Sequence, residues 1–137
     1  MAVHQAIFQV RTQGKGLYDV TADVARVVRA SAIEIGLCTV FVQHTSASLV
    51  IQENAAPSVR RDLERWLSDL APESRDYEHD DEGPDDMPAH LRAAITRTSE
   101  QIPVTDGGLA LGTWQAIYLC EHRRAPHTRR LVVHVAG

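Results

Sequence analysis

Histidine is the residue type that gives this sequence its greatest capacity for chemistry. The chain contains seven histidines but only two cysteines, so a disulfide framework or a cysteine-rich zinc module is excluded. His79 lies in an acidic stretch, and His90 follows eleven residues later. Neutral imidazole is a common ligand of zinc and similar metals, yet this spacing matches no standard zinc motif. The spacing alone is compatible with two alternatives: a metal site, or a pair of ordinary solvated histidines.

A polar segment, His44-Thr45-Ser46-Ala47-Ser48, separates two apolar runs. Hydroxyl and backbone N–H groups in such a turn can hold an anion such as phosphate, or they can satisfy the turn's own backbone. Asn54 follows the second apolar run and either extends this polar region or caps the next helix. The segment is therefore a candidate anion site with a plain structural alternative.

Two more polar features lie near the C-terminus. In the strand expected over residues 114–120, Gln115 and Glu121 fall on one face, which either lines a cleft or interface or is plain surface. The run from His122 to Arg130 is rich in arginine and histidine, and we expect a solvated hairpin there. Alternatively, this run attracts an anionic substrate or the acidic loop of a neighbouring subunit.

Three helices are expected to position these residues. Valines at helical spacing predict a helix over residues 21–34. A clean apolar stripe that starts at Val59 predicts a second, amphipathic helix with Pro57 in its first turn. Asp86 is a good N-cap for a third helix, and His90 then falls in its first turn, beside the apolar stripe.

Short runs rich in β-branched residues predict strands between and after these helices. Because strands outnumber helices and often follow one another directly, the pattern favours a largely antiparallel, β-sandwich-like α+β fold in a single domain of residues 1–137. Asp106-Gly107-Gly108 indicates a hairpin turn. The expected strands are 3–10, 37–43, 47–52, 101–105, 109–111, 114–120 and 129–136.

The charge distribution limits the kinds of partner. The net charge is −4, and residues 73–86 alone hold eight of the 18 acidic residues, so the chain lacks the basic character of a general nucleic-acid binder. No apolar run is long enough to span a membrane, and the N-terminus has no signal-peptide pattern. The two cysteines lie in apolar runs and are expected to be reduced and buried. We therefore expect a cytoplasmic protein with neither nucleic acid nor membrane as a partner.

Three segments, taken in order, resemble a known family. HTSASLVIQENA, YEHDDEGPDDMPAHL and IPVTDGGLALGTWQAIYLCEHR look like the motifs of the YjbQ family, also called UPF0047. The resemblance implies an α+β sandwich fold and a homotrimer. It also implies a weak, secondary thiamine-phosphate synthase activity, which couples a pyrimidine diphosphate to a thiazole phosphate and releases pyrophosphate.

The resemblance also assigns candidate site residues. His44, His79 and His90 match the family's motif histidines, and we expect them to meet in a catalytic centre that holds a divalent metal, zinc or magnesium, or an anion. Asp62 is expected to orient a histidine or the metal. Two alternatives remain: a metal-dependent hydrolase, and a non-catalytic trimer that binds a metal or an anion. The residues expected to bind a phosphorylated substrate are Ser46, Ser48, Asn54 and Gln115.

Overall fold

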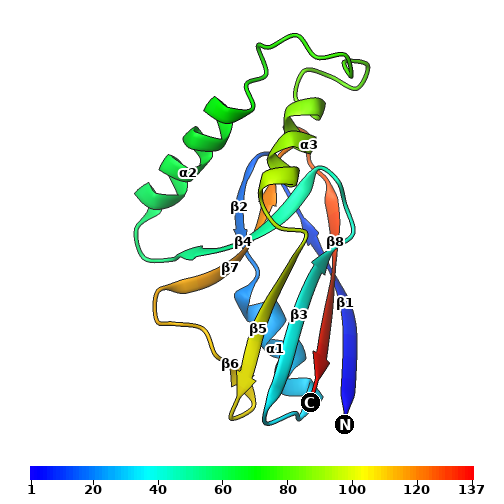
Figure 1. The fold of residues 1–137 in the computed structure, drawn as a ribbon, viewed down its shortest axis with the longest axis vertical. Helices are drawn as coiled ribbons and strands as arrows, with labels where there is room; N and C mark the ends of the chain where they lie inside the picture. Colours follow the sequence, from blue (N-terminus) through cyan, green and yellow to red (C-terminus); the bar gives the residue numbers. More distant parts are fainter.

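The computed structural model describes all of residues 1–137, and its strands form two antiparallel sheets (Figure 1). The larger sheet has five strands in the order β1-β8-β3-β5-β6, and the smaller has three in the order β2-β7-β4. Every strand pairing is antiparallel, which confirms the predicted α+β class. The strands are β1 (Val3–Arg11), β2 (Gly16–Asp19), β3 (Gly36–Val42), β4 (Ala47–Glu53), β5 (Ser99–Thr105), β6 (Gly108–Leu109), β7 (Gln115–Glu121) and β8 (Thr128–Ala136).

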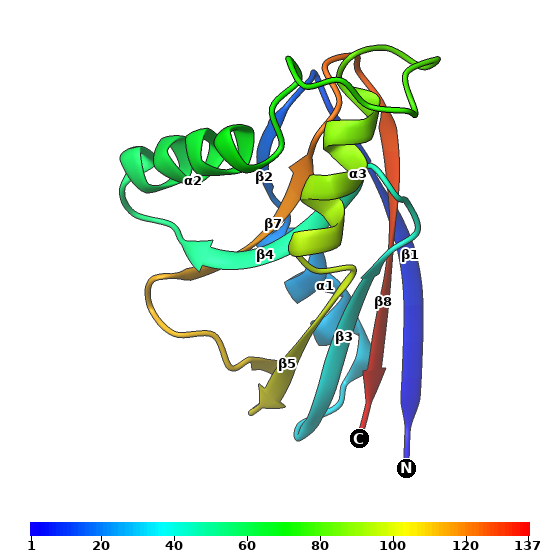
Figure 2. The same ribbon diagram turned by 45° about the horizontal axis from the view of Figure 1, so that its top comes forward.

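Three helices complete the fold: α1 (Thr21–Ser31), α2 (Pro57–Leu70) and α3 (Asp86–Ile95). Val24 and Val28 of α1 are fully buried and join side chains of both sheets in one apolar core. In contrast, α2 stands apart from the sheets in Figures 1 and 2, and only its Leu67 is buried. None of the three helices is long and apolar enough to cross a lipid bilayer.

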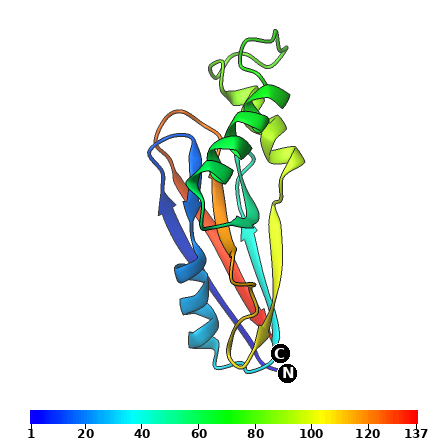
Figure 3. The same cartoon turned by 90° about the vertical axis from the view of Figure 1, so that its left-hand side faces the viewer.

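The helices α2 and α3 lie at one end of the elongated molecule, whereas α1 and both chain termini lie at the other (Figure 3). The loop between α2 and α3 carries the acidic stretch and covers that first end. The termini are tied together because the backbone N–H groups of Ala2 and Gly137 each donate to the other residue's carbonyl. The acidic loop and α3, which carry His79 and His90, therefore lie at the end opposite the termini.

Most element boundaries follow the predictions, and the exceptions have local causes. The helix expected over 21–34 ends at Ser31 because Ala32 adopts a left-handed conformation with φ 57°. The strand β2 was not predicted, since its four residues directly follow a glycine turn. The hairpin turn is confirmed: Asp106 and Gly107 both have positive φ, 51° and 75°, as a two-residue turn between β5 and β6 requires.

The strand β7 differs most from its prediction. It is buried at every position from Ala116 to Glu121, because it is the central strand of the smaller sheet and both of its faces are covered. Ile117 belongs to the apolar core, while Tyr118 faces α2 and accepts a hydrogen bond from Arg60 at 3.2 Å. The interpretation of Glu121 as a cleft or surface residue is therefore wrong; its exposed fraction is 0%.

Candidate metal centre

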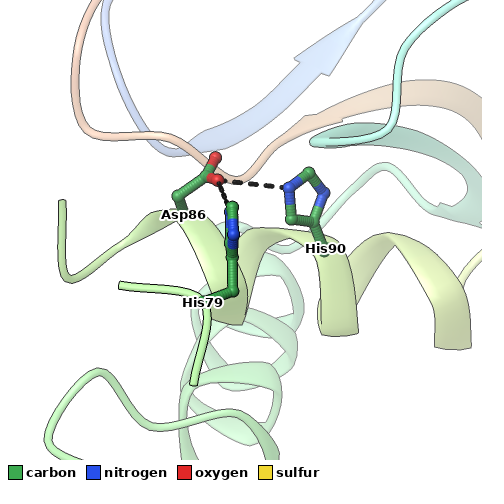
Figure 4. Close-up of side chains that lie close together, drawn as sticks. All are labelled: His79, Asp86 and His90. Atoms are coloured by element: carbon green, nitrogen blue, oxygen red, sulfur yellow. Dashed lines mark hydrogen bonds and ion pairs between the residues drawn. The ribbon is translucent and has the colours of Figure 1, made fainter. Parts of the chain in front are cut away.

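The first turn of α3 and the acidic loop before it bring His79, Asp86 and His90 together (Figure 4). Asp86 and His90 are four residues apart on one helix and therefore share a face. The loop returns His79 to the same carboxylate. Asp86 Oδ2 lies 2.7 Å from His79 Nε2 and 3.2 Å from His90 Nε2. Two imidazoles from separate segments thus converge on one oxygen atom.

The ring orientation of His90 is set by a backbone carbonyl. His90 Nδ1 lies 2.9 Å from the carbonyl oxygen of Thr45, which can only accept, so Nδ1 carries the proton and donates. Nε2 then faces the Asp86 carboxylate either as the second donor of an imidazolium or, in the neutral ring, as a lone pair that can bind a cation. A ring whose outer N–H is held by a backbone carbonyl is common among metal-ligating histidines.

Asp86 is held as an anion. Burial raises the pKa of this carboxyl, but the hydrogen bond from His79 and the charges of His90 and Arg123 outweigh that effect and hold its pKa below the ordinary value. Arg123 Nη1 lies 2.8 Å from Asp86 Oδ1, which leaves Oδ2 to the histidines. Conversely, the hydrogen bond with Asp86 raises the pKa of His79. Without a metal, the proton between His79 Nε2 and Asp86 Oδ2 therefore lies on His79.

The donor set fits a divalent metal ion. The ligand atoms of His79, Asp86 and His90 all lie within 4.8 Å of one another. Zinc binds imidazole nitrogen and carboxylate oxygen at about 2.0–2.2 Å, and two histidines with one carboxylate leave coordination positions open for a substrate. The Asp86 side chain is 4% exposed, but those of His79 and His90 are 40% and 32% exposed. An ion could therefore reach the centre from solvent.

A small hollow adjoins this centre. It has a volume of about 300 Å³ and is lined by both His90 and His44. Its other walls combine small apolar side chains with hydroxyl groups: Thr45, Ala47, Ala93, Ala94 and Thr98.

The structure does not bring His44 into the cluster, contrary to the expectation of three converging histidines. His44 Nε2 accepts a hydrogen bond from the backbone N–H of Arg130 at 2.8 Å, so this nitrogen is not free to bind a metal. Its Nδ1 faces Arg129 Nη1 at 3.5 Å. The third group of the cluster is Asp86, which the sequence suggested only as a helix cap. The signal that could have identified it is its four-residue spacing from His90.

The two serines that were expected to bind phosphate are engaged inside the protein. Arg129 Nη2 donates to the Ser46 hydroxyl at 3.0 Å. The Ser48 hydroxyl is buried and lies 2.8 Å from His122 Nε2 and within hydrogen-bonding distance of the Thr96 hydroxyl. Neither hydroxyl faces the hollow as a free donor, so the phosphate role predicted for Ser46 and Ser48 finds no support in this geometry.

The remaining predicted site residues lie away from the cluster. Asp62 is exposed on α2 and makes no hydrogen bond or ion pair with a histidine, so its predicted orienting role is not supported. Asn54 is exposed and does not cap α2, whose N-cap residue is Ala56. Gln115 Oε1 accepts a hydrogen bond from the backbone N–H of Gly112 at 2.8 Å. This bond holds the Gln115 side chain against the turn that precedes β7.

The buried ion pair between Glu121 and Arg129 stabilises the segments around the centre. Glu121 accepts hydrogen bonds from the Thr12 hydroxyl and from Arg129 Nε, each at 2.7 Å, and from the backbone N–H of Arg123 at 3.1 Å. Arg129 in turn holds the polar turn, because its Nη2 donates to the Ser46 carbonyl at 3.2 Å. The same network therefore fixes the Thr45 carbonyl that orients His90.

The basic run is mostly exposed, as expected for a solvated segment, but this expectation is wrong at His122 and Arg129, which are 2% and 3% exposed. Its arginines bind the acidic loop of the same chain. Arg123 Nε and the backbone N–H of Arg124 donate to Asp85 Oδ2 at 3.0 and 2.9 Å, and Arg124 also pairs with Glu73. These contacts hold the loop that carries His79.

The fold and site define a class: a two-sheet α+β protein with a His–Asp–His cluster at the start of one helix. The chain belongs to the UPF0047 family, because the family model "UPF0047 protein YjbQ-like" matches residues 6–137. A UPF0047 protein of Synechocystis is 54% identical to it, and that alignment covers 98% of this chain and 92% of the relative. YjbQ of Escherichia coli O157:H7 is 38% identical, with 98% of each chain covered.

Solved structures agree with this assignment. A YjbQ/UPF0047 protein of Clostridium acetobutylicum superposes with a TM-score of 0.89 at 33% identity, over 96% of this chain and 99% of that one. A protein of Sulfolobus solfataricus described as YbjQ-like and of unknown function superposes with a TM-score of 0.88 at 27% identity, over 98% and 99% of the two chains. The predicted family and fold are thereby confirmed.

The buried ion pair predicts a large effect for the substitution Glu121→Gln. The amide keeps the size of the side chain but leaves the Arg129 charge buried without its partner, which is expected to cost about 3–5 kcal/mol in the free energy of unfolding. Urea unfolding followed by circular dichroism measures this loss. Glu34→Gln, at an exposed carboxylate, is the matched control and should change stability by less than about 0.5 kcal/mol. Equal effects of the two substitutions would contradict the role given to Glu121.

His122 predicts a specific pH dependence. Burial, reinforced by the charge of Arg92, lowers the pKa of His122 from 6.5 to about 4. Between these values the unfolded chain binds the proton and the folded chain does not, so stability falls as the pH is lowered from 6.5 towards 4. The loss attributable to this residue reaches about 3 kcal/mol at pH 4. Unfolding of His122→Gln should therefore depend less steeply on pH in that range, with His134→Gln as control. An unchanged slope would refute the assignment.

Proposed function

We propose that this protein is a divalent-metal-dependent enzyme acting on phosphorylated small molecules, with His79, Asp86 and His90 as its metal ligands. The observation that carries the proposal is the convergence of His79 Nε2 and His90 Nε2 on the ionised Asp86 Oδ2, at 2.7 and 3.2 Å. A cation bound there would be ligated by all three atoms at once.

The surrounding residues are arranged as support for such a site. Arg123 holds the second oxygen of Asp86, and the Thr45 carbonyl holds the ring of His90. Outer contacts of this kind fix ligand orientation and make imidazole more basic, and they contribute strongly to metal affinity. A divalent ion there supplies charge stabilisation to a phosphate oxygen or to a departing phosphate group.

The specific reaction proposed is the one that the family resemblance implies. A thiamine-phosphate synthase reaction forms a carbon–nitrogen bond between a pyrimidine diphosphate and a thiazole phosphate, while pyrophosphate leaves with the electrons of the broken carbon–oxygen bond. The leaving group is strongly anionic, so a cation beside the hollow supports this assignment. The proposal places the activity in the cytoplasm, where phosphorylated metabolites and reduced cysteines are expected.

A metal-dependent hydrolase is the second candidate, and the size of the hollow favours it. At about 300 Å³ the hollow lies at the small end of the range for ligand pockets. One small phosphoester and a water molecule fit such a volume more readily than two phosphorylated ring systems. Both candidates use the same metal ligands. The synthase would break a carbon–oxygen bond and transfer carbon to the thiazole nitrogen, whereas the hydrolase would transfer a phosphoryl group to water.

The substitution Asp86→Asn tests the metal proposal. Titration of untagged, chelator-treated wild-type protein with zinc, followed by calorimetry and elemental analysis, should give one bound ion per chain. Asp86→Asn removes the shared anionic ligand and should lower the affinity at least tenfold. Metal-dependent release of pyrophosphate from the diphosphate substrate, or of phosphate from a generic phosphoester, should be lost in the same variant.

Asp76→Asn is the matched control, because Asp76 is an exposed carboxylate of the same acidic loop and makes no hydrogen bond or ion pair with the cluster. It should retain zinc binding and turnover. A wild-type protein that binds no divalent ion, or an Asp86→Asn variant with undiminished turnover, would overturn the proposal. Pyrophosphate release and phosphate release distinguish the two candidate reactions.

We also propose that the chain assembles as a homotrimer, as the resemblance implies. The apolar face of α2 supports self-association, because Trp66 and Leu70 are 54% and 50% exposed in the single chain. Large uncovered apolar side chains of this kind mark interaction surfaces.

Light scattering tests the assembly. The wild-type protein should have three times the 15.1 kDa mass of one chain. Trp66→Glu, which puts a charge on the apolar face, should shift the protein to the monomer, whereas Ser68→Glu, at an exposed position of the same helix, should not. A monomeric wild-type protein would refute the trimer.

A further inference from the structure

One edge of the buried Arg129 guanidinium has no acceptor. Its Nε and Nη2 atoms are used by Glu121 and by Ser46. The only neighbour of Nη1 within hydrogen-bonding distance is His44 Nδ1, at 3.5 Å. Arg129 is 3% exposed, so a donor on this group that lacks an acceptor is costly.

His44 cannot supply that acceptor. Its Nε2 accepts the backbone N–H of Arg130 at 2.8 Å and must therefore be unprotonated. A neutral imidazole carries one proton, which then lies on Nδ1, the atom that faces Arg129. Arg129 Nη1 and His44 Nδ1 are thus two donors directed at the same space, and neither satisfies the other.

We propose that His44 Nδ1 and Arg129 Nη1 form an oxyanion site, in which one oxygen of a carboxylate or phosphate group accepts a hydrogen bond from both. The contact with guanidinium is charge-assisted, which makes it shorter and stronger than a neutral hydrogen bond. The local charge also favours an anion, because the guanidinium groups of Arg129 and Arg130 near His44 outnumber the single carboxylate of Glu121.

The position of His44 connects this site to the metal centre. His44 and His90 line the same hollow, so a small acid held by His44 lies on the side of the hollow opposite or next to one of the proposed metal ligands, His90. In the proposed enzyme, this site binds the substrate through a single acidic group of the substrate. This last step rests on the proposed metal-dependent function, whereas the oxyanion site itself does not.

Titration of the metal-free protein with inorganic phosphate, and separately with acetate, tests the site. The backbone amide of Arg130 and the imidazole nitrogens of His44, followed by nitrogen-15 NMR, should show saturable shifts with at least one of the two ions. Before titration, the His44 nitrogen shifts should identify the Nδ1–H tautomer. Saturation by phosphate alone assigns the anchor to a phosphoryl group, and saturation by acetate alone assigns it to a carboxylate.

Variants separate this site from the metal centre. His44→Phe should bind the ion about tenfold or more weakly and still bind zinc. Asp86→Asn should lose zinc and keep the ion, and His134→Phe is the matched control for removal of an imidazole. If His44→Phe does not fold, His44→Gln serves instead, because its amide retains one acceptor and one donor and should bind with intermediate affinity.

Two outcomes would overturn the site: no saturable shift with either ion, which leaves water as the acceptor, or undiminished anion binding by the folded His44 variant. A wild-type protein that binds the anion but no zinc would contradict only the proposed function. A wild-type protein that binds zinc but neither ion would contradict only the oxyanion site.

Discussion

Burial of the Glu121 carboxylate is the constraint on which the functional end of this protein depends. A fully buried anion is tolerated only where charged and polar donors surround it, and here the donors come from Thr12, Arg123 and Arg129. These residues belong to different segments. Their hydrogen bonds to one carboxylate therefore fix the end of β1, the β7–β8 connection and β8 relative to one another. From that arrangement Arg129 reaches the polar turn before β4, and Arg123 reaches the start of α3.

Arg123 and Arg129 hold two different parts of the site in place. Arg123 orients Asp86 so that one oxygen remains for His79 and His90, while Arg129 fixes the turn whose Thr45 carbonyl holds His90. These contacts are made within the folded chain before any ligand binds, so the candidate metal ligands are preorganised. The same turn keeps His44 apart from the cluster, with its Nε2 bound to the backbone and its Nδ1 beside Arg129.

The sequence predicts local features of this molecule better than long-range ones. The amphipathic stripe of α2 and the Asp106-Gly107 turn are local patterns, and both elements form as expected. The grouping of His79 with His90 also succeeds, because one continuous segment carries both. The family resemblance groups His44 with them, and the sequence does not reveal the pairing of Glu121 with Arg129, because both contacts depend on where β8 lies relative to strands of the two sheets. The sequence indicates Asp86 only as a helix cap, since it does not show which loop returns to a helix.

X-ray absorption spectroscopy at the zinc edge of the zinc-loaded wild-type protein tests the central claim most directly. The structure predicts a coordination shell of two imidazole nitrogens and one carboxylate oxygen at about 2.0–2.2 Å, completed by water or another small ligand. A shell with three imidazoles would contradict it, because His44 would then have left the position that Glu121 and Arg129 define. A shell without imidazole would place the metal elsewhere and remove the basis of the proposed function.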